Sequence, residues 1–286
     1  MSDTSQEPTN ARADTVTTAS GANPWSTVSS PRAPSLGIPT LAELRLAAGF
    51  LTILPVMPQS SAELDAVARS FGWFPLVGFV VGGVLAVENA GLSAVFGTLL
   101  ASAMTIATLC VLSGAMHLDA IADTADAIGA GTDRGRALEI MRDSRVGSFA
   151  TTAIVFLLLL ETLALARADR SGVGRAMTAL WLAPGLARWA MVAVSWRMEY
   201  LRVEGAGAAL VRASGARNLT LGTVIVALAV LPVLSLRTLA ACAVAAILAV
   251  ALRAGYRRWL GGVTGDLIGA AGQIVELAVL LAMAVR

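Results

Sequence analysis

Long apolar segments restrict the fold of this chain more than any other feature of its sequence. A helix needs about 20 apolar residues to cross the hydrocarbon core of a bilayer, and lipid-exposed backbone must satisfy its own hydrogen bonds, as a helix does. The sequence therefore predicts an all-α fold, a polytopic integral membrane helical bundle with about seven transmembrane helices. The predicted spans are 74–97, 98–116, 149–166, 177–196, 219–234, 238–252 and 267–285.

The overall composition supports a membrane location. Apolar residues make up 56% of the 286 residues and charged residues 14%, whereas soluble domains are roughly one-quarter charged. The net charge of +2 lacks the basic excess that neutralises a nucleic-acid backbone, so nucleic acid is excluded as a partner. Cys110 and Cys242 lie far apart in apolar segments, without the paired spacing of a metal site or disulfide framework.

The N-terminal region differs from the rest of the chain. Residues 1–35 are rich in Ser, Thr, Ala and Pro and contain no apolar run, so they are predicted to form a disordered tail. They lack the pattern of a secretory signal, so the internal apolar segments are expected to direct membrane insertion. Segments 41–56 and 58–71 are predicted to lie at the membrane interface. Residues 36–286 then form a single polytopic membrane catalytic domain.

Arginine distribution predicts the orientation. All 21 basic residues are arginines. With the N-terminus in the cytoplasm, 15 of them fall on the cytoplasmic side and 5 on the other, as the positive-inside rule requires of a protein in the plasma or inner membrane. The polar loops 117–148, 197–218 and 253–266 all face the cytoplasm in this arrangement, so one site can draw on all three. Arg188 alone lies within a span, where it needs a cavity or a partner.

Three aspartates follow the second predicted span. In a helix, Asp119, Asp123 and Asp126 stand at i, i+4 and i+7 and share one face within about a 60° arc. Carboxylates at this spacing repel one another, and oxygen-only ligands favour a hard cation such as Mg²⁺. The alternative is an ordinary solvated face neutralised by downstream arginines. Those arginines are Arg134, Arg136, Arg142 and Arg145.

The segment 134–147 adds groups suited to an anion. Guanidinium groups such as those of Arg142 and Arg145 make bidentate contacts with phosphate oxygens, although arginines in such a loop also act simply as topology anchors. Asp143 is either a further metal ligand or a local partner of Arg145, and its position in the sequence leaves both readings open.

Two more regions carry candidate residues. His117 is the only histidine and adjoins the acidic run, where it is either a proton carrier near neutral pH or a packed side chain. The glycine-rich turn 261–265 precedes the last span, and a helix that begins at Gly265 offers free backbone amides to an anion. Asp266 is then either a metal ligand or the cap of that helix.

Several sequence blocks together resemble one known family, the cobalamin synthases (adenosylcobinamide-GDP ribazoletransferases). The likeness runs from about residue 41 to the C-terminus, and its longest and most specific part lies within 117–147. The blocks are FLTILPV at 50–56, FPLVGFVVG at 74–82, HLDAIADTADAIG at 117–129, RALEIMRDSRVGSF at 136–149 and GGVTGDLIGA at 261–270.

The resemblance implies a specific reaction and site. Such an enzyme joins α-ribazole, or its 5′-phosphate, to adenosylcobinamide-GDP and releases GMP, with Mg²⁺ as the cofactor and the membrane lipid as its surroundings. By matching position, the metal ligands are Asp119, Asp123 and Asp126. The same site is implied to contain His117, Asp143, Arg145 and Asp266.

This chain departs from the family pattern at a few positions, and two other functions compete with the implied one. Leu267 replaces a common threonine, and Gly272 with Gln273 replaces a usual Asn-Glu pair. A CDP-alcohol-type phosphotransferase also uses clustered aspartates, but with the order D-x-x-D rather than the D-x-x-x-D-x-x-D found here. A divalent cation transporter is expected to carry acidic residues in mid-span and internal repeats.

Overall fold

The structure is a computed structural model that describes residues 39–56, 64–129, 131, 133–143, 145–202, 206–212 and 215–285. Within these residues the regular structure is helical, apart from one isolated bridge between Tyr200 and Val263. The predicted all-α fold is therefore confirmed. The predicted tail at 1–35 lies outside the described residues.

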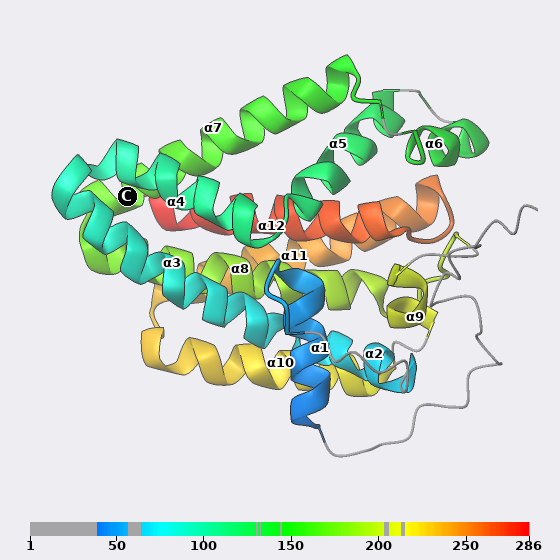
Figure 1. Cartoon of the computed structure of the whole chain (residues 1–286), viewed down its shortest axis with the longest axis horizontal. Helices are drawn as coiled ribbons and strands as arrows, with labels where there is room; N and C mark the ends of the chain where they lie inside the picture. Colours follow the sequence, from blue (N-terminus) through cyan, green and yellow to red (C-terminus); the bar gives the residue numbers. More distant parts are fainter. Residues whose placement is uncertain are drawn as a thin grey trace, which may run out of the picture.

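The described helices follow one another with short connections (Figure 1). They are α1 (Leu41–Leu51), α2 (Leu64–Ser70), the 3₁₀-helix η1 (Phe71–Trp73), α3 (Phe74–Phe96), α4 (Thr98–Leu112), α5 (Met116–Gly129), α6 (Arg134–Ile140), α7 (Ser148–Arg170), α8 (Val173–Ser195), α9 (Ala206–Arg212), α10 (Ala216–Val230), the 3₁₀-helix η2 (Leu231–Val233), α11 (Leu236–Trp259) and α12 (Gly265–Ala284).

Six helical stretches are long and apolar enough to cross a membrane, and the bent pair α4 and α5 makes a seventh if it counts as one span. This agrees with the predicted number of about seven. The first stretch is longer than predicted, because α2 and η1 continue into α3 to give 30 residues, Val67–Phe96. The other five stretches are α7, α8, α10 with η2, α11 and α12.

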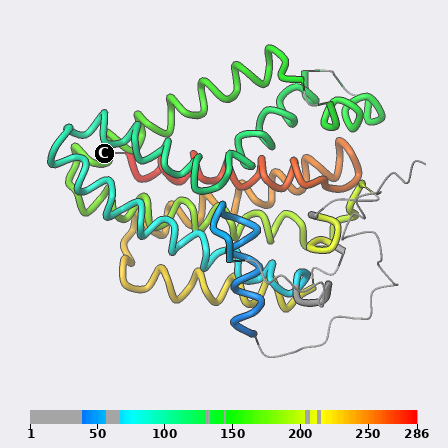
Figure 2. The backbone as a smooth tube through the Cα atoms, in the orientation of Figure 1, coloured from blue at the N-terminus to red at the C-terminus, as the bar shows by residue number. Residues whose placement is uncertain are grey.

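The second predicted span is broken. It was expected to run to residue 116, but α4 ends at Leu112 and α5 leaves it at an angle of 89° (Figure 2). Gly114 and Ala115 have positive φ values of 59° and 57° at the break, a conformation that glycine adopts easily and alanine adopts only with strain. The amide of Ile53 donates to the carbonyl of Leu112 at 2.9 Å, which satisfies a group that the broken helix leaves free.

Helices α8 and α12 form the centre of the bundle, whereas α10 and α11 are mostly exposed at its periphery. Glycines bring α3 close to α8. A Cβ atom at Gly78 would lie 2.4 Å from the carbonyl oxygen of Pro184, and one at Gly82 would lie 2.3 Å from that of Leu180. Small residues at such crossings let helix backbones pack tightly where no hydrophobic effect drives association.

Helix α1 runs across the long axis of the bundle (Figure 1) and has only 11 residues, which fits the predicted interfacial role. Its Glu43 is buried and accepts hydrogen bonds from Arg69, Trp73 and Arg217. Burial by itself raises the pKa of Glu43, but the hydrogen bonds from Arg217, Arg69 and Trp73 outweigh it and hold the pKa below its usual value. Glu43 thus ties α1 to α2, η1 and α10.

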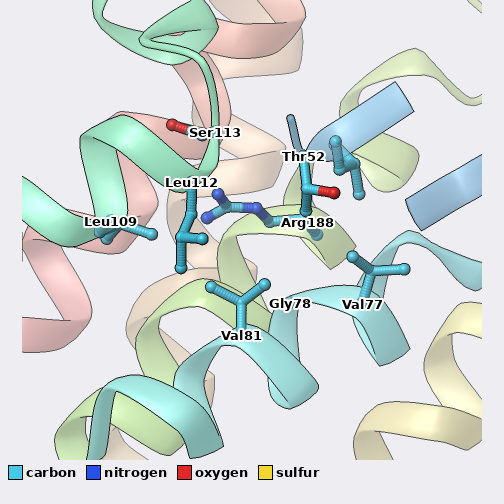
Figure 3. Close-up of a pocket in the computed structure, with 9 residues that line it drawn as sticks. Thr52, Val77, Gly78, Val81, Leu109, Leu112, Ser113 and Arg188 are labelled. Carbon is cyan, nitrogen blue, oxygen red and sulfur yellow. The ribbon is translucent and has the colours of Figure 1, made fainter. Parts of the chain in front are cut away.

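The arginine inside a span has both a partner and a pocket. Arg188 of α8 pairs with Glu276 of α12, and both side chains are buried. Figure 3 shows its guanidinium reaching into a small pocket beside Leu112 and Ser113, opposite Thr52. An arginine within a span was expected to need a cavity or a partner. Arg188 has both, on the side of α8 that faces α12 and α4.

Candidate active site

Three polar loops lie at one end of the bundle, where the start of α12 stands between α6 and α9 (Figure 1). Arg202 joins them. Its Nη2 atom donates to the carbonyl oxygen of Met141 at 2.9 Å and to a carboxylate oxygen of Asp266. One guanidinium thus links the loops 117–148, 197–218 and 253–266, and the single shared site expected from the sequence has a physical basis.

The acidic run is helical, as predicted, and forms α5. This helix packs against α12 and α7, and a Cβ atom at Gly269 of α12 would lie 2.6 Å from Cβ of Ala120. Such close packing brings the start of α12 beside the acidic face. Asp119 is exposed and Asp123 half-buried, and the charges of Asp266 and Asp119 both act on Asp123. A fourth carboxylate from a distant part of the chain therefore joins the acidic face.

Asp266 does not cap its own helix. The N-cap of α12 is Thr264, whose hydroxyl accepts from the amide of Leu267 at 3.2 Å. This leaves the Asp266 side chain to bind Arg202, with the Thr264 hydroxyl 3.4 Å from the same oxygen. Gly265 is half-buried in the first turn of α12, so the backbone amides that it offers lie at the same end of the bundle. Of the two readings for Asp266, metal ligand or cap, the structure contradicts the cap, and the metal-ligand reading stays a prediction.

Asp126 has a different role from the other aspartates of α5. Its two carboxylate oxygens accept hydrogen bonds from the backbone amides of Gly147, at 2.6 Å, and Ala150, at 2.9 Å. These amides open α7, whose own N-cap residue contributes no side-chain hydrogen bond. A Cβ atom at position 147 would lie 2.6 Å from Asp126 Oδ1, so glycine is needed there. Asp126 therefore caps α7 from the neighbouring helix.

Asp126→Asn should lower the stability of the protein more than its chemistry. The amide side chain loses one of two acceptor oxygens, and loss of a helix cap typically costs about 0.5–2 kcal/mol. Thermal unfolding of the purified protein in detergent measures this, with Asp123→Asn as the matched comparison that should leave the unfolding temperature nearly unchanged. If Asp126→Asn kept full stability while turnover collapsed, Asp126 would be a metal ligand and the capping role secondary.

Asp143 and Arg145 bind one another. Both the backbone amide and the Nε atom of Arg145 donate to Asp143, at 3.1 and 3.0 Å, and these hydrogen bonds hold the pKa of Asp143 below its usual value. Arg142 is exposed beside them. Among the residues that the structure describes, no hydrogen bond or ion pair joins these three to the aspartates of α5. The structure thus supports the reading of Asp143 as a local partner of Arg145.

His117 lies away from the acidic face. It precedes Asp119 by two residues, which places it about 200° around the helix, and its side chain is only 2% exposed. Neither ring nitrogen has a hydrogen-bond partner among the described residues. The structure therefore does not bring His117 together with the predicted metal ligands.

The carboxylates of the acidic face fit a hard cation that also binds oxygen atoms of a substrate. Among the described parts of the chain, no three His, Cys, Asp or Glu side chains are already arranged to hold a metal ion. Mg²⁺ does not need such a cage, because it commonly uses one or two carboxylates, several waters and substrate phosphates. Asp119 and Asp123 would offer two carboxylates to such an ion on one face of α5, and the charge of Asp266 acts on Asp123 as well.

Arg202 was not identified from the sequence. The loop 197–218 contains four arginines, Arg197, Arg202, Arg212 and Arg217, and no spacing distinguishes the one that reaches Asp266. The sequence offered only a weaker indication. The arginine-containing loop 197–218 and Asp266 were predicted to lie on the same side of the membrane. Only the pairing of Tyr200 with Val263 places Arg202 next to Asp266.

These features define a class: a polytopic α-helical membrane protein whose carboxylates and one bridging arginine gather at one end of the bundle. The comparison with known families is specific. Residues 43–284 match the family described as Cobalamin-5-phosphate synthase, which covers most of the chain, so the protein belongs to the cobalamin synthase family.

Relatives from distant bacteria agree with this. The chain is 38% identical over 241 residues to the adenosylcobinamide-GDP ribazoletransferase of Syntrophobacter fumaroxidans, covering 83% of this chain and 96% of that protein. Proteins of the same name from Desulforamulus reducens and Escherichia coli are 35% and 34% identical, each over 82% of this chain and over 92% and 96% of their own lengths. No solved structure matches the chain.

Proposed function

We propose that this protein is an adenosylcobinamide-GDP ribazoletransferase, which joins α-ribazole or its 5′-phosphate to adenosylcobinamide-GDP and releases GMP. The single observation that carries the site assignment is the convergence of Asp119, Asp123 and Asp266 beside Arg202. These residues come from three loops that are far apart in the sequence. Family membership favours this reaction over a CDP-alcohol phosphotransferase or a cation transporter.

The chemistry of the reaction matches the groups at this end of the bundle. An oxygen of α-ribazole or its phosphate attacks the phosphorus attached to cobinamide, a new P–O bond forms, and the phosphoanhydride bond to GMP breaks. Negative charge develops on the departing phosphate. Phosphoryl transfer is catalysed mainly by positioning and by cationic charge, so the guanidinium of Arg202 and a cation on the acidic face supply what the transition state needs.

Mg²⁺ is the proposed cofactor. Asp119 and Asp123 would hold it, and when bound it would neutralise phosphate oxygens and polarise the reacting phosphorus. Asp266 keeps Arg202 in place through its ion pair, so the arginine is held beside the acidic face rather than left to solvent. Backbone amides at Gly265 and the exposed arginines Arg142 and Arg145 are available for the outer phosphates.

The test is direct. Liposomes containing the purified protein receive adenosylcobinamide-GDP, α-ribazole and Mg²⁺, and both GMP and the corrinoid product are quantified. We expect equal amounts of the two products and no turnover when the divalent ion is chelated. GMP release without a new corrinoid product would show that the protein only hydrolyses adenosylcobinamide-GDP. Full activity in the presence of chelator would contradict the proposed role of Mg²⁺.

The proposed orientation places the acidic site in the cytoplasm, at the plasma or inner membrane. In a background in which Cys110 and Cys242 are alanine, Glu139→Cys in α6 should react with a membrane-impermeant thiol reagent only from the cytoplasmic side. Ser171→Cys, at the opposite end of α7, should react only from outside. Both side chains are exposed. Labelling of the two positions from the same face would contradict this arrangement.

A further inference from the structure

Two arginines lie against one tryptophan at the end of α8 and α11, apart from the acidic site, and a third stands beside them. The guanidinium carbon of Arg197 lies 5.0 Å from the ring centre of Trp196, and that of Arg253 lies 5.7 Å from it. Arg253 also donates to the backbone carbonyl of Trp196. Arg257 stands one helical turn beyond Arg253 on the same face of α11. These contacts hold the positive charges together on an aromatic platform.

The charges are not compensated within the described chain. Arg253 is repelled by both Arg257 and Arg197, and none of the three forms an ion pair with a residue that the structure describes. A topology signal alone explains why arginines lie on this side of the membrane, but it does not require them to converge. Positive charges held together in this way repel one another, and an anion bound between them relieves that repulsion.

The position of the cluster indicates which anion. Helix α11 has 24 residues and at 1.5 Å per residue is about 36 Å long, which exceeds the hydrocarbon thickness of roughly 30 Å. Its last turn, with Arg257 and Trp259, therefore reaches the headgroup level, where tryptophan is also enriched, and Arg253 lies one turn before it. Below them, Val250 and Ile247 are 69% and 67% exposed and offer an apolar surface to an acyl chain.

We propose that Arg197, Arg253 and Arg257 bind the headgroup phosphate of one anionic phospholipid, in the leaflet next to the acidic site. The acyl chains would lie along the exposed face of α11. Met198, which follows Arg197, leads directly into the segment 199–201 that pairs with Val263, and Arg202 comes next in the chain. A lipid bound here would therefore fix the loop that delivers Arg202, without touching the reacting groups.

The test uses native mass spectrometry of the delipidated full-length protein in detergent. Phosphatidylglycerol and phosphatidylcholine with identical acyl chains are added in equal amounts, and the retained lipid is counted. We expect one phosphatidylglycerol to be retained in preference to phosphatidylcholine. Replacing Arg197 or Arg253 by glutamine should weaken its binding by about fivefold for each arginine, the effect expected of one guanidinium near an anionic surface.

A matched control is available on the same helix. Arg258→Gln removes the same charge at the same level, but Arg258 points about 100° away from Arg257 around α11 and makes no contact with Trp196. It should retain phosphatidylglycerol as the wild type does. Equal retention of both lipids, or an equal loss in Arg258→Gln, would overturn the proposal. Competition by inorganic phosphate at lipid concentrations would also overturn it, because the site would then bind free phosphate.

Discussion

Asp123→Asn should lower the turnover of GMP formation by about a hundredfold or more. Asp123 stands in the middle of the acidic face, between Asp119 and Asp126, and the charges of Asp266 and Asp119 both act on it. Asparagine keeps the size and most hydrogen bonding but removes the charge, so a hard cation binds less well. Loss of one preorganised electrostatic contact to a transition state typically costs about 10²–10³ in rate. The measurement is GMP release in liposomes across a Mg²⁺ titration.

The control is Glu139→Gln, the same carboxylate-to-amide change on α6 at the same end of the bundle. Glu139 is exposed and makes no side-chain contact that the structure describes, so turnover should stay close to that of the wild type. If Asp123 belonged to a merely solvated face, its neutralisation would only relieve repulsion. Wild-type turnover of Asp123→Asn at ordinary Mg²⁺ would therefore rule out the metal-site assignment.

The architecture was largely predictable, because apolar length determines a membrane fold almost by itself. The number of spans and the helical acidic run were confirmed. The break between α4 and α5 was not predicted, since the sequence around Gly114 contains no proline or charge to end the span. The carbonyl of Leu112 at the break accepts from the amide of Ile53, which is distant in the sequence, and no local pattern records that contact.

The candidate site was predictable in part. Helical spacing placed Asp119 and Asp123 on one face. It could not show that Asp126, on the same face, accepts hydrogen bonds from the amides of Gly147 and Ala150. Proximity in sequence also suggested that His117 belongs to the site, whereas helical geometry turns it away. Such roles depend on contacts between loops that are distant in the sequence. The hydrogen bonds of Arg202 to Met141 and Asp266 are an example.

The buried ion pair of Arg188 and Glu276 connects the two central helices, α8 and α12. Their side chains are 5% and 1% exposed, and Figure 3 shows the guanidinium of Arg188 beside Leu112 of α4. A second buried carboxylate, Glu161 of α7, accepts a hydrogen bond from Gln273 of α12 at 2.7 Å. Loss of Arg188 would leave the buried carboxylate of Glu276 without its ion-pair partner.

Arg188→Met should therefore destabilise the protein by about 3–5 kcal/mol, the usual effect of removing one partner from a buried ion pair. The double change Arg188→Met with Glu276→Leu should recover much of this loss, because an apolar pair of similar volume avoids the desolvation cost. Thermal unfolding in detergent, followed by tryptophan fluorescence, completes the double-mutant cycle. Arg237→Met, at an exposed position of α11, is the control and should change stability by less than about 0.5 kcal/mol. If the two single changes were mild and simply additive, the pair would not be what holds α8 against α12.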